Sequence, residues 1–130
     1  MAEVCKTFHI QWVTDRVIAR MQVRELARSL HFDLREQACI SLATYNILCS
    51  LGMGTSCEGE VSVSHLQDGK RGGMQIVCTT IGQAKKDITP TSFGDTLSLV
   101  DELSVHKNLP NGDCVTIVKW EDKDRLHFHE

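Results

Sequence analysis

Residues 33–52, DLREQACISLATYNILCSLG, decide the fold that we expect from this sequence. Asp33 can accept from the free backbone N–H groups of a first helical turn, and Glu36 stands three residues later, as a capping box requires. From Gln37 to Leu51 the run is apolar almost all round, which is typical of a helix buried on several sides. Gly52-Met53-Gly54 ends the pattern. The sequence therefore predicts a central helix here.

Upstream of this helix, the sequence predicts a strand and then another helix. Phe8 to Val13 reads as a short strand, after which Thr14 or Asp15 can cap the helix. Apolar residues then recur at helical spacing until the pattern stops near His31. They are Val17, Ile18, Met21, Val23, Leu26, Ala27 and Leu30.

Downstream, alternating side chains predict two hairpins. In order, we expect strands over 60–66 and 74–80, a polar loop over 81–93, a helix over 96–102, strands over 103–108 and 114–120, and a loose charged tail over 121–130. The order β-α-α-β-β-α-β-β predicts an α+β fold. We expect a two-layer sandwich, in which helices cover one face of a mixed, mostly antiparallel sheet.

Composition narrows the class of protein. A chain of 130 residues fits one domain, 1–130. Its 14 basic and 17 acidic residues give a net charge of −3, which argues against a general electrostatic grip on nucleic acid. No apolar run is long enough to span a membrane, and the first residues lack the features of a signal peptide. We therefore expect a cytoplasmic protein.

The six cysteines form no CxxC pair, and without a signal peptide we expect reduced, buried thiols. They are Cys5, Cys39, Cys49, Cys57, Cys78 and Cys114. A redox-sensing role for Cys57 and a metal-binding role for His127 and His129 are alternatives. Since neither has partners at a suitable spacing, no metal site is predicted.

Two segments carry a resemblance to a known family. DRVIARMQVRELARSLHFDLREQACISLATYNILCS (15–50) and LSLVDELSVHKNLPNGDCVTIVKW (97–120) resemble the opening and closing segments of the GHKL (Bergerat-fold) serine kinases of bacterial anti-sigma and stressosome switches. The resemblance covers roughly residues 8–121, and Val23–Gln37 is its most specific part. It implies a histidine-kinase-like ATPase fold.

The family places a glutamate and, four residues later, an asparagine on the central helix. The resemblance implies that the glutamate acts on the hydroxyl nucleophile and that the asparagine holds Mg²⁺ on the phosphates. These positions fall on Asn46 and Ser50 here. An amide cannot act as a base, and a hydroxyl is a weaker ligand for Mg²⁺. The sequence therefore predicts no catalytic residue.

The family's other nucleotide motifs are also eroded. The aspartate that receives the adenine amino group has become Thr80, and of the glycines that follow it only Gly82 is present. The glycine-rich lid keeps only Gly94, beside Asp95. The turn between the last strands keeps Gly112, and the threonine after it has become another acid.

Losing a charge-assisted hydrogen bond costs about 1.5–3 kcal/mol, so several such losses together predict very weak or absent ATP binding. The resemblance then implies a pseudokinase that regulates by binding a STAS-domain antagonist, a sigma factor or a phosphatase, with no cofactor. The alternative is a divergent, active serine/threonine kinase that uses Mg-ATP.

A row of arginines at helical spacing is a candidate docking face. It consists of Arg16, Arg20, Arg24 and Arg28. A solvated helix face is the other interpretation, and the sequence leaves open whether the protein forms a homodimer.

Overall fold

The computed structural model describes residues 3–82, 93–109 and 112–121, and its elements follow the predicted order. They are β1 (Glu3–Ile10), α1 (Val13–Ser29), α2 (Leu34–Leu51), β2 (Glu58–Asp68), β3 (Arg71–Ile81), α3 (Gly94–Leu97), β4 (Glu102–Leu109) and β5 (Gly112–Trp120). Most of the expected loop over 81–93, and the expected tail beyond residue 121, lie outside the described residues.

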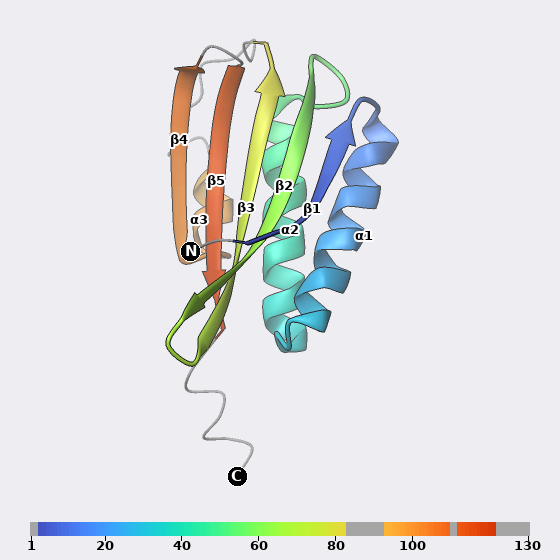
Figure 1. Ribbon diagram of the computed structural model, residues 1–130. Helices are drawn as coiled ribbons and strands as arrows, with labels where there is room; N and C mark the ends of the chain where they lie inside the picture. Colours follow the sequence, from blue (N-terminus) through green and yellow to red (C-terminus); the bar gives the residue numbers. More distant parts are fainter. Residues whose placement is uncertain (1–2, 83–92, 110–111, 122–130) are drawn as a thin grey trace.

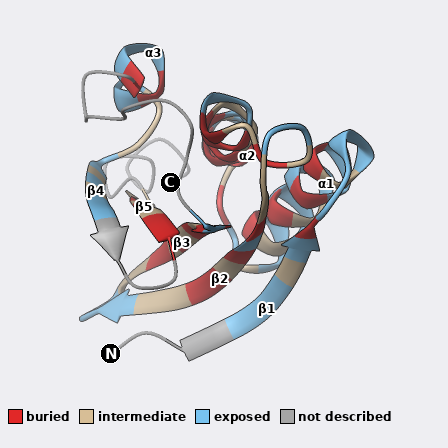
Figure 2. Cartoon of the chain, turned by 90° about the horizontal axis from the view of Figure 1, so that it is seen from above, coloured by how far each residue is buried: buried red, intermediate tan, exposed pale blue. Residues whose placement is uncertain are grey.

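One sheet and the helices on one of its faces form the α+β architecture (Figures 1 and 2). The sheet has five strands in the order β1-β2-β3-β5-β4, and each described strand pairing is antiparallel. The expectation of a mixed sheet is therefore wrong for these strands. Only two residues separate β2 from β3 and β4 from β5 along the chain, whereas a parallel pair would need a long crossover.

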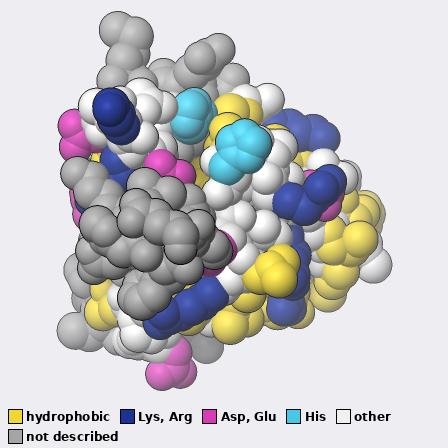
Figure 3. Space-filling view, turned by 90° about the horizontal axis from the view of Figure 1, so that it is seen from below, with side chains coloured by type: hydrophobic (Ala, Val, Ile, Leu, Met, Phe, Trp, Pro, Cys, Tyr) yellow, Lys and Arg dark blue, Asp and Glu magenta, His cyan; other side chains and the backbone are white. Residues whose placement is uncertain are grey.

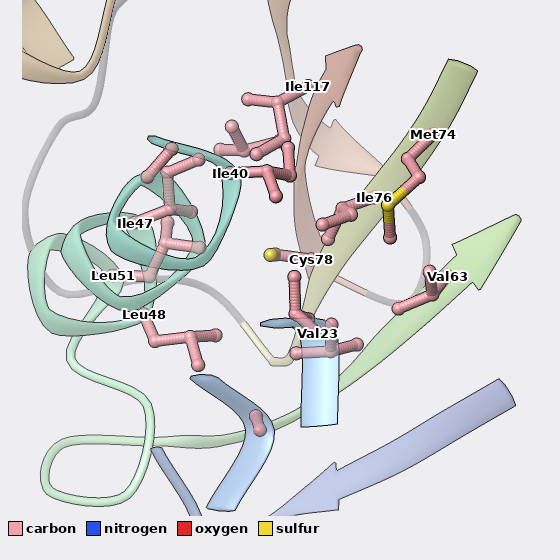
Figure 4. Close-up of a cluster of buried hydrophobic side chains, with 14 of the residues drawn as sticks. Val23, Ile40, Ile47, Leu48, Leu51, Val63, Met74, Ile76, Cys78 and Ile117 are labelled. Atoms are coloured by element: carbon pink, nitrogen blue, oxygen red, sulfur yellow. The ribbon is translucent and has the colours of Figure 1, made fainter. Parts of the chain in front are cut away.

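The helix pair α1 and α2 packs on the sheet through an apolar interior (Figure 4). Ile40, Ile47 and Leu48 of α2 are fully buried and lie opposite Ile76 of β3 and Ile117 of β5. Val23 brings α1 into the same cluster. Alternation along the strands sends these side chains inward, so the core lies between the sheet and the helices.

The start of α2 confirms the predicted capping box. Asp33 Oδ1 accepts from Glu36 N at 2.8 Å, and Glu36 Oε1 accepts from Asp33 N at 2.9 Å. The helix ends at Gly52, whose φ of 73° is the left-handed conformation that glycine adopts readily. The helix is not buried all round, because Leu34 is 72% exposed and Leu42 is 37% exposed.

The N-terminal boundaries differ from the prediction. The first strand spans Glu3–Ile10 rather than 8–13, and Trp12 occupies the N-cap position of α1. Asp15 lies inside the first turn, where its Oδ2 accepts from Gln11 N and Trp12 N, both at 2.9 Å. These backbone hydrogen bonds lower the pKa of Asp15, so its carboxylate stabilises the helix start without being the N-cap.

The predicted helix over 96–102 is shorter and earlier than expected. It spans only Gly94–Leu97, and Glu102 already pairs with Val118 at the start of β4. Asp101 N donates to Val118 O at 2.9 Å, and Asp101 Oδ2 accepts from Trp120 N at 2.6 Å. These contacts with β5 draw residues 101–102 into the sheet and end the helix.

Candidate functional site

A hollow of about 380 Å³ lies between the C-terminal half of α2 and α3. Asn46, Cys49 and Ser50 line it from α2, and Phe93–Thr96 line it from the other side. The structure thus brings together three of the positions predicted from the resemblance: Asn46, Ser50 and Gly94.

The chemistry of this hollow is that of amides and hydroxyls. Asn46 and Ser50 stand one helical turn apart on one face of α2. Among the described residues that line the hollow, Asp95 is the one carboxylate, and its side chain is exposed. No described lining residue is a cation that could neutralise a phosphate. The hollow therefore offers a ligand neutral polar groups and one exposed carboxylate.

Thr80 lies away from this hollow and turns its hydroxyl into the protein. Its side chain is fully buried, and its Oγ1 donates to Gly82 O at 2.5 Å and accepts from Asp113 N at 2.9 Å. The one hydrogen of this hydroxyl goes to Gly82 O, and one of its two acceptor positions takes the N–H of Asp113. The Thr80 side chain therefore serves a contact between β3 and β5.

Gly112 takes part in the same contact. Its φ is 129°, and a Cβ at this position would lie 2.2 Å from Thr80 O and 2.6 Å from Gly82 O. Only glycine allows the two backbones to approach this closely. Thr80, Gly82 and Gly112 thus form a packed junction between strand ends, separate from the hollow beside Asn46.

The second glycine position after Thr80, which is Ala84 here, lies outside the described residues, as do His127 and His129.

Arg16 contradicts the prediction of a continuous arginine face. Its side chain is buried, and its Nε donates to Met53 O at 2.5 Å. Its guanidinium also donates to Thr55 Oγ1 at 3.1 Å and to Cys49 Sγ at 3.5 Å. Arg16 therefore fastens the loop that follows α2. Helical periodicity was the one sequence signal for this row of arginines. It could not show that Arg16 is buried, because the partner Met53 is 37 residues away.

The other three arginines do reach the surface. The Arg20 guanidinium lies 5.4 Å from the ring centre of Tyr45, a cation–π contact between α1 and α2. Arg24 is exposed. Arg28 pairs with Glu25, and this contact lowers the pKa of Glu25 and raises that of Arg28.

An exposed apolar surface on α1 was not predicted from the sequence. We call it the α1 patch, and its members are Trp12 (64% exposed), Val13 (46%), Val17 (46%), Ile18 (52%) and Met21 (64%). Seen from below, hydrophobic side chains gather beside basic ones on the side where α1 lies (Figure 3). Helical periodicity could have predicted this exposed surface. Val17, Ile18 and Met21 cannot lie on the same helix face as the other apolar residues, which are Ala19, Val23 and Ala27.

A second hollow, of about 650 Å³, lies at the N-terminal end of α2. Its lining combines Arg35, Arg71 and Lys119 with five carboxylates, those of Asp33, Glu36, Asp101, Glu102 and Glu121. The Arg71 guanidinium stacks 4.6 Å from the ring centre of Trp120. No position predicted from the resemblance lies here.

The cysteines are all free thiols, but only Cys78 is fully buried. Burial raises the pKa of Cys78 to about 12. Cys5 and Cys49 are exposed, so the prediction of buried thiols is wrong for these two. Cys57 is half-buried, and its Sγ donates to Leu51 O at 3.4 Å. Within the described ranges, no three or more His, Cys, Asp or Glu side chains are placed to hold a metal ion.

Compared with known proteins, the chain matches no protein-family model and no curated protein. In the part of the chain that the structure describes, none of the helices has the length and apolar character needed to cross a bilayer.

Proposed function

We propose that this protein is a pseudokinase of the GHKL type, a binding module that regulates a protein partner without phosphoryl transfer. The proposal joins the resemblance of residues 15–50 and 97–120 to the geometry of the nucleotide positions. The five-stranded antiparallel sheet with helices on one face is compatible with the histidine-kinase-like ATPase fold that the proposal requires.

The observation that carries the proposal is the inward hydroxyl of Thr80. The family needs a charged acceptor for the adenine amino group at this position. Here the side chain is fully buried and already bonded to Gly82 O and Asp113 N. Opening it to a ligand would break both bonds, and each buried group left without a partner costs about 1–3 kcal/mol.

The phosphate end of the site supports the same conclusion. Asn46 and Ser50 offer an amide and a hydroxyl where a base and a metal ligand are needed, and the nearby carboxylate of Asp95 opposes a triphosphate. Phosphoryl transfer depends on positioning and on Mg²⁺ electrostatics, so it is more sensitive to these losses than binding is. We infer that no cofactor is used.

The partner, on this proposal, is a STAS-domain antagonist, a sigma factor or a phosphatase, held in the cytoplasm. The protein acts by occupying a surface of that partner. Nucleic acid is not expected as a ligand, because the net charge of −3 opposes phosphate backbones.

The test is a calorimetric titration with Mg-ATP and Mg-ADP up to about millimolar concentration. A dissociation constant of about 1 mM corresponds to a binding free energy of about −4 kcal/mol. We expect no binding heat. The double variant Asn46→Glu/Ser50→Asn is a matched control, because it restores the family pair but leaves Thr80 bonded. It should still fail to bind.

Micromolar binding by the unmodified chain would contradict the proposal. It would favour the alternative of a divergent active kinase, which a phosphorylation assay on STAS-domain proteins would then examine.

A further inference from the structure

The α1 patch groups five large apolar side chains, each about half exposed or more: Trp12, Val13, Val17, Ile18 and Met21. Val13, Val17 and Met21 stand one helical turn apart, so they form a stripe along the outer face of α1. Single exposed apolar residues are ordinary on a protein surface, whereas a contiguous group of this kind marks a surface for interaction.

The opposite face of α1 already supplies the core. Ala19, Val23 and Ala27 are fully buried and belong to the apolar interior. The side chains of the stripe stay largely exposed to water after α1 has packed, so they contribute little to the core. Burying large apolar side chains is favourable, so a partner that covers the patch would gain binding free energy from it.

A basic edge runs beside the stripe. Arg20 and Arg24 stand three residues after Val17 and Met21, and neither forms an ion pair with a described residue. The nearby carboxylates are already engaged. Asp15 accepts from two backbone N–H groups, and Glu25 is bonded to Arg28. The edge therefore offers unpaired positive charge, although the whole chain is net negative.

Arg20 lies on one side of the stripe. The Arg20 guanidinium lies over the ring of Tyr45, so this edge faces α2. An apolar stripe with cations along one side is complementary to a helix that carries an apolar stripe with carboxylates along one side.

We propose that the α1 patch docks an acidic amphipathic helix of a partner protein. This inference rests on the proposed function as a binding module and adds the chemistry of the partner.

A second copy of the chain is a poorer occupant. In a two-fold interface the same surface of each copy faces the other, so the basic edge of one copy would find no acidic edge on the second. Asp15 and Glu25 are already bonded and cannot neutralise it. Like charges across an interface disfavour association.

The test uses the indole of Trp12 as a reporter inside the site. The variant Trp120→Phe removes the other tryptophan, and circular dichroism checks that it folds. Two synthetic helical peptides of about 18 residues share one leucine stripe and carry either glutamate or lysine beside it. We expect the glutamate peptide to shift the Trp12 emission to the blue and to bind at least about tenfold more tightly than the lysine peptide. Fluorescence anisotropy of labelled peptides repeats the measurement with the unmodified chain.

Three variants make the result specific. Arg20→Glu/Arg24→Glu should reverse the preference between the peptides, and Met21→Asp should weaken both by at least about tenfold. Arg35→Glu changes an exposed arginine away from the patch and should leave binding unchanged.

Equal affinity for the two peptides, or no binding up to about 1 mM, would overturn the inference. So would self-association through the patch in sedimentation, or binding to phosphatidylserine vesicles in place of the peptide. The nucleotide titration tests the loss of ATP binding independently of the peptide experiment. A failure of peptide binding would therefore not contradict the loss of ATP binding, and detection of ATP binding would not contradict peptide docking.

Discussion

Arg16 Nε donates to Met53 O at 2.5 Å. This hydrogen bond links the N-terminal end of α1 to the loop that follows α2. The same guanidinium reaches Thr55 Oγ1 and Cys49 Sγ, so one side chain holds three points of this segment. Gly54 shows how close the approach is, because a Cβ there would lie 2.7 Å from Trp12 O. The loop and the start of α1 therefore form one packed unit.

Arg16→Ala should destabilise the protein by about 2–3 kcal/mol, because it leaves the buried Met53 carbonyl without its charged donor. The measurement is urea unfolding followed by circular dichroism. Arg24→Ala is the matched control on the exposed side of the same helix and should change the free energy of unfolding by less than about 0.5 kcal/mol. Equal effects would show that Arg16 is held no more firmly than a surface arginine.

Gly112→Ala should be severely destabilising, since the new Cβ would meet backbone oxygens of Thr80 and Gly82 at 2.2 Å and 2.6 Å. We expect a loss of about 3 kcal/mol or more, because both the contact and the positive φ are unfavourable. Gly69→Ala controls for φ alone: its φ is 61° and nothing lies within 4 Å of the added Cβ.

Gly69→Ala should lower the free energy of unfolding by only about 1 kcal/mol. Thermal unfolding of the two variants measures the difference, and a Gly112→Ala protein as stable as Gly69→Ala would contradict the close junction between β3 and β5.

Thr80→Val should cost about 1–3 kcal/mol, because it removes the hydroxyl that Asp113 N and Gly82 O share and keeps the side-chain volume. Thr80→Ser keeps the hydroxyl and should cost less. Chemical denaturation of both variants ranks them. If Thr80→Ser were the less stable of the two, the methyl group and not the hydrogen bonds would hold the junction.

Local signals account for what the sequence predicted correctly. The capping box of Asp33 and Glu36 involves residues three apart, and the ending at Gly52 depends on one residue's conformation. Neither needs knowledge of the rest of the chain. The element order was readable for the same reason.

Non-local contacts account for what was missed. The end of α3 depends on Asp101 meeting Trp120, and the burial of Arg16 depends on Met53. The bond that holds the Thr80 hydroxyl likewise depends on Asp113, which is 33 residues away. Periodicity along the chain carries no information about such pairs.

Cys78 should make stability depend on pH in the alkaline range. Burial raises its pKa from 9.0 to about 12, so the folded protein keeps the proton that the unfolded chain loses. The contribution of this thiol is fully present below pH 9.0 and is lost as pH rises toward about 12. The slope is about 1.4 kcal/mol per pH unit within that window.

Cys78→Ala removes the titrating group, so the difference in free energy of unfolding between it and the unmodified chain should shrink as pH rises from 8 to about 10.5, the range that lies mostly within this window. Taking the difference cancels the contributions of the ionisable groups that the two proteins share. Val61→Ala changes a fully buried side chain that has no ionisable group, so it is the control and should show a constant difference. A Cys78→Ala difference that stays constant with pH would mean that the thiolate is accommodated in the folded state, contrary to its full burial among apolar side chains.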